Sequence, residues 1–267
     1  MQEMINQSRP SLCGWVGKVI TVLLFAALPA AAQQPTAGDA STQDPPKTRN
    51  KISADPKVDG TSPKGTSNDR LFYALPNFLT LENATQLPPL TAKQKFQVAA
   101  RSSFDYVEYP WYGALAGIGQ AENSESGFGQ GAAGYAKRYA AMFADGTIEN
   151  FMTAAILPSL LKEDPRFYQT YTGTVWRRTG YAVSRIFVTR TDSGHEQFNF
   201  SEIVGAAIAA AISTYTYHPR EDRNLANTAS VWGTQVGYDT LTIVVKEFWP
   251  DLRRKLSHKP PTEALAP

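Results

Sequence analysis

Cysteine is almost absent from the sequence, since Cys13 is the only one in 267 residues. Cys13 precedes an apolar run in a segment that we expect to be removed, so the remaining chain should have no disulfide, thiol nucleophile or thiolate metal ligand. An excess of one charge is also lacking, because 26 Lys and Arg balance 24 Asp and Glu to a formal net charge of +2. Nucleic-acid binding needs many more uncompensated cations, so we expect no nucleic-acid partner.

Motifs that mark common catalytic and cofactor sites are missing as well. The three histidines are not spaced as a zinc-binding pair, none lies in H-E-x-x-H, and there is neither G-x-S-x-G nor a P-loop. Residues 129–134 match G-x-G-x-x-G, but the preceding residues 121–126 are polar and do not form the buried strand that a dinucleotide site needs. We therefore expect no cofactor and no metal ion.

Residues 1–32 have the pattern of a secretory signal peptide. Arg9 and Lys18 make the start positive, residues 19–32 are apolar, and small residues end the run at Ala30 and Ala32. The apolar run is shorter than the about 20 residues of a membrane-spanning helix, which favours cleavage after Ala32 over a retained anchor. The pattern predicts an exported protein.

Composition divides the rest of the chain into three parts. Residues 33–69 are rich in Pro, Gly, Ser and Thr with almost no large apolar side chains, which predicts a disordered linker. Residues 70–256 are long enough to form one domain around its own core. Residues 257–267, which include Pro260 and Pro261, are expected to form a flexible tail.

The pattern of residues 70–256 predicts a mainly α fold with five to six helices. The clearest amphipathic helix covers 131–161, where Pro158 is expected to break or kink it. Further helices are expected over 92–107, 113–117, 200–215 and 224–249. Residues 174–189 favour a helix, although β-branched residues and a turn-like segment at 191–194 leave a β-hairpin open.

Small residues line one face of each of the last two expected helices. Gly205, Ala209 and Ser213 form the first stripe, and the second includes Gly233 and Gly237. Such stripes allow close backbone contact, so we expect both helices to pack tightly and Gly237→Leu to be severely destabilising through overpacking.

On the last helix, Gln235, Asp239 and Lys246 face away from this stripe. Many aromatic residues elsewhere in the domain keep membrane contact open as an alternative to a water-surrounded core.

Candidate site residues lie on one face of the helix expected over 131–161. Arg138, Asp145 and Glu149 share this face, and Asp145 and Glu149 are one turn apart, so their carboxyl groups could share a proton or hold a cation. The alternative is a structural network in which these carboxylates pair with arginines of the following segment. Arginines in that segment are Arg166, Arg177, Arg178, Arg185 and Arg190.

Part of the sequence resembles an uncharacterised family of exported bacterial proteins. The resemblance is carried by residues 155–167, by Arg185 and by residues 189–194, and it extends over most of 71–256. The family has no assigned activity, so the resemblance implies bacterial export and transfers no catalytic residue.

Three functions are compatible with these observations. The first is a non-enzymatic cell-envelope scaffold or binding module, either periplasmic or associated with the outer membrane, with an envelope protein or the membrane surface as partner. The second is a hydrolase-like or ligand-binding enzyme that uses Arg138, Asp145 and Glu149. The third is a membrane-inserted helical protein that uses the stripe containing Gly233 and Gly237.

Overall fold

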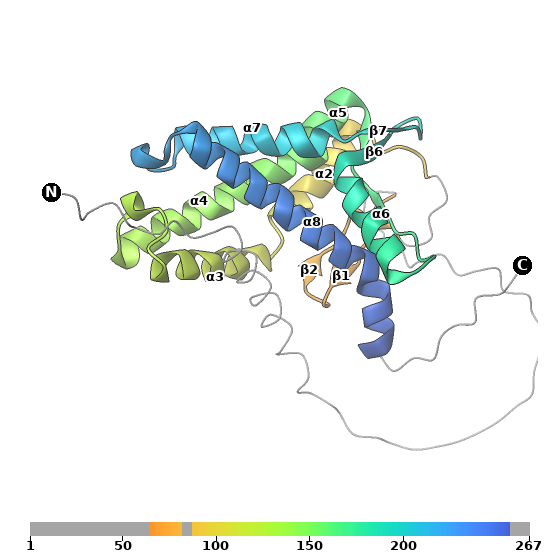
Figure 1. Ribbon diagram of the computed structural model, residues 1–267, viewed down its shortest axis with the longest axis horizontal. Coiled ribbons are helices and arrows are strands. Elements are labelled where there is room, and N and C mark those ends of the chain that lie inside the picture. The colour runs from red at the N-terminus through yellow and green to blue at the C-terminus, as the bar shows by residue number, and fades with distance from the viewer. Residues whose placement is uncertain (1–64, 82–86, 257–267) are drawn as a thin grey trace, which may run out of the picture. The chain divides into compact units, whose positions relative to one another are not determined.

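The computed structural model describes residues 65–81 and 87–256 (Figure 1). The predicted signal peptide, residues 33–64 of the predicted linker and the tail 257–267 lie outside the described residues. The mainly α fold is confirmed. Its helices are α2 (Ala92–Ser103), α3 (Glu108–Ala121), α4 (Gly131–Phe151), α5 (Leu157–Leu161), α6 (Val175–Phe187), α7 (Phe200–Thr216) and α8 (Leu225–Leu256). Because α4 and α5 are continuous, the described residues form six helices, as predicted.

Pro158 does not end the helix that begins at Gly131. A π-helical turn, η3 (Met152–Ile156), connects α4 to α5, and the backbone N–H of Leu157 donates to the carbonyl of Met152. Proline carries no N–H and is tolerated in the first turn of a helix, where Pro158 lies. The wider π turn thus carries the helix past the proline.

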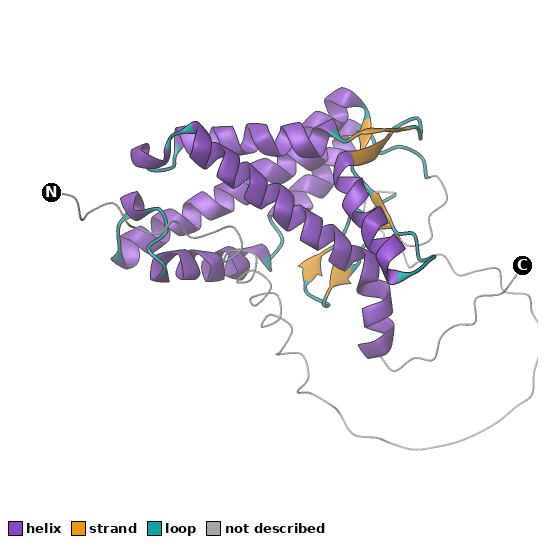
Figure 2. Ribbon diagram, in the orientation of Figure 1, coloured by secondary structure: helices purple, strands orange, loops and turns teal. Residues whose placement is uncertain are grey.

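The short strands lie near α5, α6 and the C-terminal part of α8 (Figure 1 and Figure 2). β1 (Arg70–Leu71) pairs with β2 (Leu75–Pro76), and β3 (Thr80–Leu81) pairs in parallel with β5 (Phe167–Tyr168). β4 (Glu163–Asp164), β6 (Val188–Thr191) and β7 (Glu196–Phe198) form an antiparallel sheet in the order β4-β6-β7.

Residues 65–69 form the end of the predicted linker, but they contact the helical domain. Ser67 N–H donates to the Phe78 carbonyl at 2.8 Å, and Arg253 pairs with Asp69 at 3.0 Å.

The segment 174–200 contains both predicted alternatives, a helix followed by a β-hairpin. Thr174 caps α6 by accepting from the Arg177 N–H, and this helix confirms the preferred interpretation. The β-branched residues that follow form β6, and the expected turn leads into β7 with Gly194 at φ +89°. A positive φ favours glycine, which explains the position of the turn.

Small side chains make the core contacts of α7. Ala206, Ala209 and Ala210 are fully buried, and a Cβ atom on Gly205 would lie 3.3 Å from side-chain atoms of Leu157. α7 packs against α4, η3 and α8. The long helix α8 contacts α7 along one part of its length and α6 along another (Figure 1). The predicted packing through small residues is confirmed for α7.

The small-residue stripe of α8, by contrast, faces outward. A Cβ atom on Gly233 or Gly237 would meet no atom within 4 Å, and Ala226 on the same stripe is exposed. Asp239 and Lys246, on the opposite face, line an internal cavity. The prediction of tight packing along this stripe is therefore wrong, and the contact that overpacking by Gly237→Leu requires is absent.

None of the helices within residues 65–81 and 87–256 combines the length and the apolarity needed to cross a bilayer.

Candidate functional site

Arg138 holds a loop rather than a carboxylate. Its guanidinium donates to the carbonyls of Ser124, Glu125 and Gly129 and to the side chain of Gln120, at distances of 2.6 to 3.1 Å. The side chain is 1% exposed. These bonds satisfy the cation by fixing the turn before α4, and Arg138 forms no ion pair with a carboxylate among the described residues.

Asp145 connects α4 to the end of α7. Its carboxylate accepts hydrogen bonds from Ser213 and Tyr217 and pairs with His218 Nε2 at 3.2 Å. His218 Nδ1 lies 2.9 Å from Glu125. Burial lowers the pKa of His218, but the two carboxylates outweigh it and raise the pKa to about 10. The partners of Asp145 thus come from α7 and the following loop, and the arginine pairing considered for it is not formed.

Glu149 belongs to a cluster of three carboxyl groups on three helices, α4, α7 and α8. Side-chain hydrogen bonds join Glu149 and Glu202 to Asp239, and Gln235 hydrogen-bonds to Glu149. Burial and the neighbouring carboxylates raise the pKa of Glu149 and of Glu202 well above their ordinary values. Both glutamic acids can therefore stay protonated and donate to the Asp239 carboxylate, which limits repulsion within the cluster.

A lysine lies beside this cluster. Burial lowers the pKa of Lys246, although the charges of Asp239 and Glu202 oppose that change. Lys246 lies two helical turns after Asp239 on the inner face of α8. In the part of the chain that the structure describes, the amine of this half-buried lysine forms no hydrogen bond and no contact ion pair.

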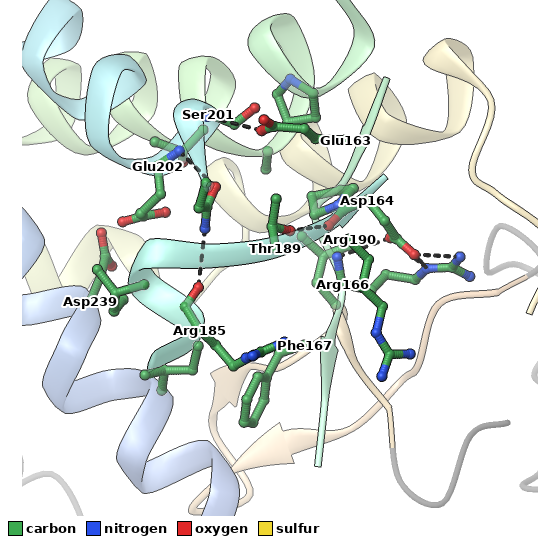
Figure 3. A pocket seen from close by; sticks show the side chains of 18 of the residues that line it. Glu163, Asp164, Arg166, Phe167, Arg185, Thr189, Arg190, Ser201, Glu202 and Asp239 are labelled. Carbon is green, nitrogen blue, oxygen red and sulfur yellow. Dashed lines mark hydrogen bonds and ion pairs between the residues drawn. The ribbon is translucent and has the colours of Figure 1, made fainter. Parts of the chain in front are cut away.

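Glu202, Asp239 and Lys246 line a cavity of about 190 Å³. Figure 3 shows the carboxyl groups of Glu202 and Asp239 facing each other at one side of this cavity, while Asp164 and Arg166 pair at another. The remaining wall comes from α6, β5, β6 and the turn after α5. Polar residues of that wall include Tyr168, Tyr181, Arg185, Thr189 and Arg190, while the further lining residues Asn199 and Thr242 belong to the start of α7 and to α8.

Two arginines add positive charge to the cavity wall. The Arg190 guanidinium lies 4.6 Å from the ring centroid of Tyr168 and forms no ion pair with any described carboxylate. Arg185 lies 4.9 Å from the Tyr181 ring centroid and pairs with the exposed Glu196 at 2.8 Å. Stacking on an aromatic ring orients a guanidinium while leaving its N–H groups free to donate.

The carboxylates on the opposite wall are already satisfied. Glu163 accepts from Gln197 at 2.8 Å and from the Ser201 N–H at 2.9 Å. Asp164 accepts from Arg166 and Tyr168, each at 2.8 Å. This wall holds α7 and the three-stranded sheet together and has little capacity left for a ligand.

Of the residues singled out from the sequence, the structure brings only Glu149 to the carboxyl cluster. The charge of Asp145 helps to raise the pKa of Glu149, and Arg138 forms no hydrogen bond with either carboxyl group. Glu202, Asp239 and Lys246 were not among the candidates. A signal for two of them is present, since Glu202 is the only charged residue of α7 and Asp239 the only one between positions 225 and 245. An isolated acid in an otherwise uncharged stretch of helix is costly to bury and therefore points to a specific role.

No group of three or more His, Cys, Asp or Glu side chains within residues 65–81 and 87–256 is arranged to hold a metal ion. Comparison of the chain with protein-family models, with curated proteins and with solved structures finds no match.

Proposed function

We propose that this chain is an exported binding protein whose internal cavity holds a small molecule with an anionic group. The observation that carries the proposal is that two nitrogen donors, the Arg190 guanidinium and the Lys246 amine, line the cavity without a contacting carboxylate among the described residues. The Arg190 cation would be stabilised by a charge partner, and a bound anion would supply one. The proposed export rests on the predicted signal peptide, and the resemblance to exported bacterial proteins supports it.

The size and chemistry of the cavity limit the ligand. A dry cavity of roughly 150 Å³ can hold benzene, so about 190 Å³ suits a molecule slightly larger than that. Glu202 and Asp239 can hydrogen-bond to a hydroxyl, carbonyl or amine at the other end of the same molecule. A small carboxylic acid with a second polar group has these features.

Ligand-dependent thermal unfolding tests this proposal. Lactate should raise the melting temperature in a concentration-dependent way, whereas lactamide, its neutral analogue, should not. Arg190→Gln should weaken lactate binding by about tenfold, the loss expected for one charge-assisted hydrogen bond. The exposed Arg177→Gln is the matched control and should bind lactate as the wild type does. Equal responses to lactate and lactamide, or no response to either, would contradict the proposal.

A second role, contact with a membrane surface, is favoured by the outward faces of α7 and α8. The one charge of α7 points inward, while Phe200, Val204 and Ile208 on its outer face are 49%, 42% and 38% exposed. An exposed apolar helix face of this kind can lie on a bilayer without spanning it.

Flotation with phospholipid vesicles tests this second role. Wild-type protein should float with the vesicles, and Ile208→Asp should reduce the floating fraction. Gln97→Asp adds the same charge at an exposed position of α2 and should leave flotation unchanged. A wild-type protein that stays entirely with the unbound fraction would exclude membrane contact through α7.

A further inference from the structure

The amine of Lys246 differs chemically from the other described lysines. Lys93, for example, is exposed at the surface of α2. Lys95 is buried, but three acceptors surround it, namely the carbonyls of Pro158 and Glu163 and the carboxylate of Asp192, at 2.7 to 3.0 Å. Lys246 is half-buried, lines a cavity and donates to no described residue, and burial lowers the pKa of its amine. A desolvated amine is the form of lysine that acts as a nucleophile.

A carboxyl group that can donate a proton lines the same cavity as this amine. Glu202 lines the same cavity and hydrogen-bonds to Asp239, whose charge acts on Lys246. Burial raises the pKa of Glu202 and lowers the pKa of Lys246, so burial favours the uncharged form of each group, while the charges of Asp239 and Glu202 oppose the change at Lys246. Environments that shift neighbouring groups in opposite directions are typical of acid–base pairs.

We infer that Lys246 captures a small carbonyl compound with an anionic group by forming an imine with it, and that Glu202 supplies and accepts the protons. This inference rests on the proposed function, because it assigns a reaction to the molecule held in the same cavity. Arg190 and Arg185 would hold the anionic group. The class of ligand that combines both features in the smallest volume is a 2-oxo carboxylic acid.

The reaction needs no oxidant or reductant. The Nζ lone pair of Lys246 adds to the carbonyl carbon while the carbonyl oxygen takes a proton from Glu202. The nitrogen then returns one proton to Glu202, which leaves a neutral carbinolamine. Glu202 protonates the hydroxyl group, which departs as water, and the nitrogen forms a double bond to carbon. The products are a protonated imine, a Glu202 carboxylate beside it, and one water molecule.

Reductive trapping with pyruvate tests the inference. The full chain is incubated with pyruvate and sodium cyanoborohydride at pH 7, digested, and mapped by mass spectrometry. The reduced adduct should form faster on Lys246 than on Lys93, because Lys246 lines the cavity that would hold pyruvate and burial favours its neutral amine. Lys95 should stay unmodified. Glu202→Gln should slow trapping on Lys246 and leave trapping on Lys93 unchanged.

Lactate separates this inference from the proposed function, since it carries the same anionic group without a carbonyl. If lactate and pyruvate stabilise the protein equally but no adduct forms on Lys246, the cavity binds anions and imine formation is excluded. If Lys246 is modified no faster than Lys93, the inference is likewise overturned. If Lys246 is modified but lactate does not bind, imine formation at Lys246 is supported and the proposed anion-binding site is rejected. Lys246→Arg, checked for folding by circular dichroism, should lose the adduct at this position only.

Discussion

Lys95, which is buried, and Lys246, which is half-buried at a cavity wall, illustrate two uses of an amine inside one helical unit. Lys95 is 1% exposed, and its ammonium group donates to two carbonyls and one carboxylate. Lys246 faces a cavity and donates to no group in residues 65–81 or 87–256. The first arrangement joins α2 to the turn after α5 and to the sheet, and leaves no capacity for a ligand. The second leaves a donor unsatisfied, which is the state that a binding site requires before its ligand arrives.

The carboxyl groups near each lysine differ in the same way. Each oxygen of Glu163 accepts a bond, from an amide side chain and from a backbone N–H. In the carboxyl cluster, by contrast, Oε1 of Glu149 and Oε1 of Glu202 are buried without a hydrogen-bond partner in the described structure. Satisfied groups indicate a structural role, and buried unsatisfied groups indicate where a ligand, water or proton is accommodated.

Replacement of Lys95 should have the largest effect on stability. Lys95→Met leaves the Asp192 carboxylate and two buried carbonyls without their donor, and should lower the free energy of unfolding by about 3 kcal/mol. Urea denaturation of wild type and variant measures this loss. Lys246→Met is the matched comparison, and because no bond is broken it should change stability by less than about 1 kcal/mol. Equal losses at both positions would remove the distinction between the two lysines.

His218 is a second cation whose carboxylate partners are in place, namely Asp145 and Glu125. Its replacement should lower the free energy of unfolding somewhat less than that of Lys95. His218→Gln should lower the free energy of unfolding at pH 7 by about 2 kcal/mol, since the bonds of Asp145 to a charged partner are lost. The pKa of about 10 in the folded protein exceeds that of an unfolded histidine, about 6.5. The stabilisation is therefore complete below the unfolded value and disappears as pH rises toward 10.

Urea denaturation at pH 6 and pH 10 checks the direction of this dependence. The difference between wild type and His218→Gln should shrink at the higher pH. A difference that grows with pH would show that the imidazole is bound in its neutral form.

Glu202 should show the opposite behaviour to a paired carboxylate. Its raised pKa means that the unfolded chain ionises first as pH increases, so the folded state loses stability from the unfolded pKa upward. Glu202→Gln cannot ionise and should be more stable than wild type at pH 8, by up to about 1 kcal/mol, and equal to it near pH 4.

Denaturation at these two pH values measures the effect, and Glu163→Gln is the control. Glu163 accepts two hydrogen bonds, so its replacement should destabilise the protein at pH 8. A Glu202→Gln variant that is also less stable at pH 8 would show that Glu202 is bound as a carboxylate.

The sequence predicts the helices better than the side of each helix that faces inward. Periodicity correctly locates α4 with α5, α6 and α7, because apolar spacing and a Thr174 cap are local properties. It misassigns α8, where the glycine stripe suggests a core face and Asp239 suggests a solvated one. The reason is that partners from other helices bury Asp239, and a single chain pattern does not reveal which helices meet.

The site residues, like the inward face of α8, depend on which helices pack together, and the sequence does not show this. Glu149 can be identified as a candidate because three charged residues share a face of α4, but Arg138 and Asp145 have separate partners. Glu202 and Lys246 come from α7 and α8, and only the packing of these helices around the cavity brings them together. Lone charges in uncharged stretches of helix single out Glu202 and Asp239, although not the cavity beside them.

Glycine-to-alanine substitutions should give the smallest change in the free energy of unfolding, and they compare the small-residue stripes of α7 and α8. Gly237 lies inside α8 with open space around its Cβ position, so Gly237→Ala should stabilise the protein by about 0.5 to 1 kcal/mol through helix propensity. Gly205→Ala is the matched change in α7, where the added methyl would lie 3.3 Å from Leu157 and 3.4 Å from the Met152 backbone. This crowding should cancel the gain or reverse it. Thermal unfolding of both variants measures the difference, and a destabilised Gly237→Ala would mean that the outer face of α8 is covered by a partner.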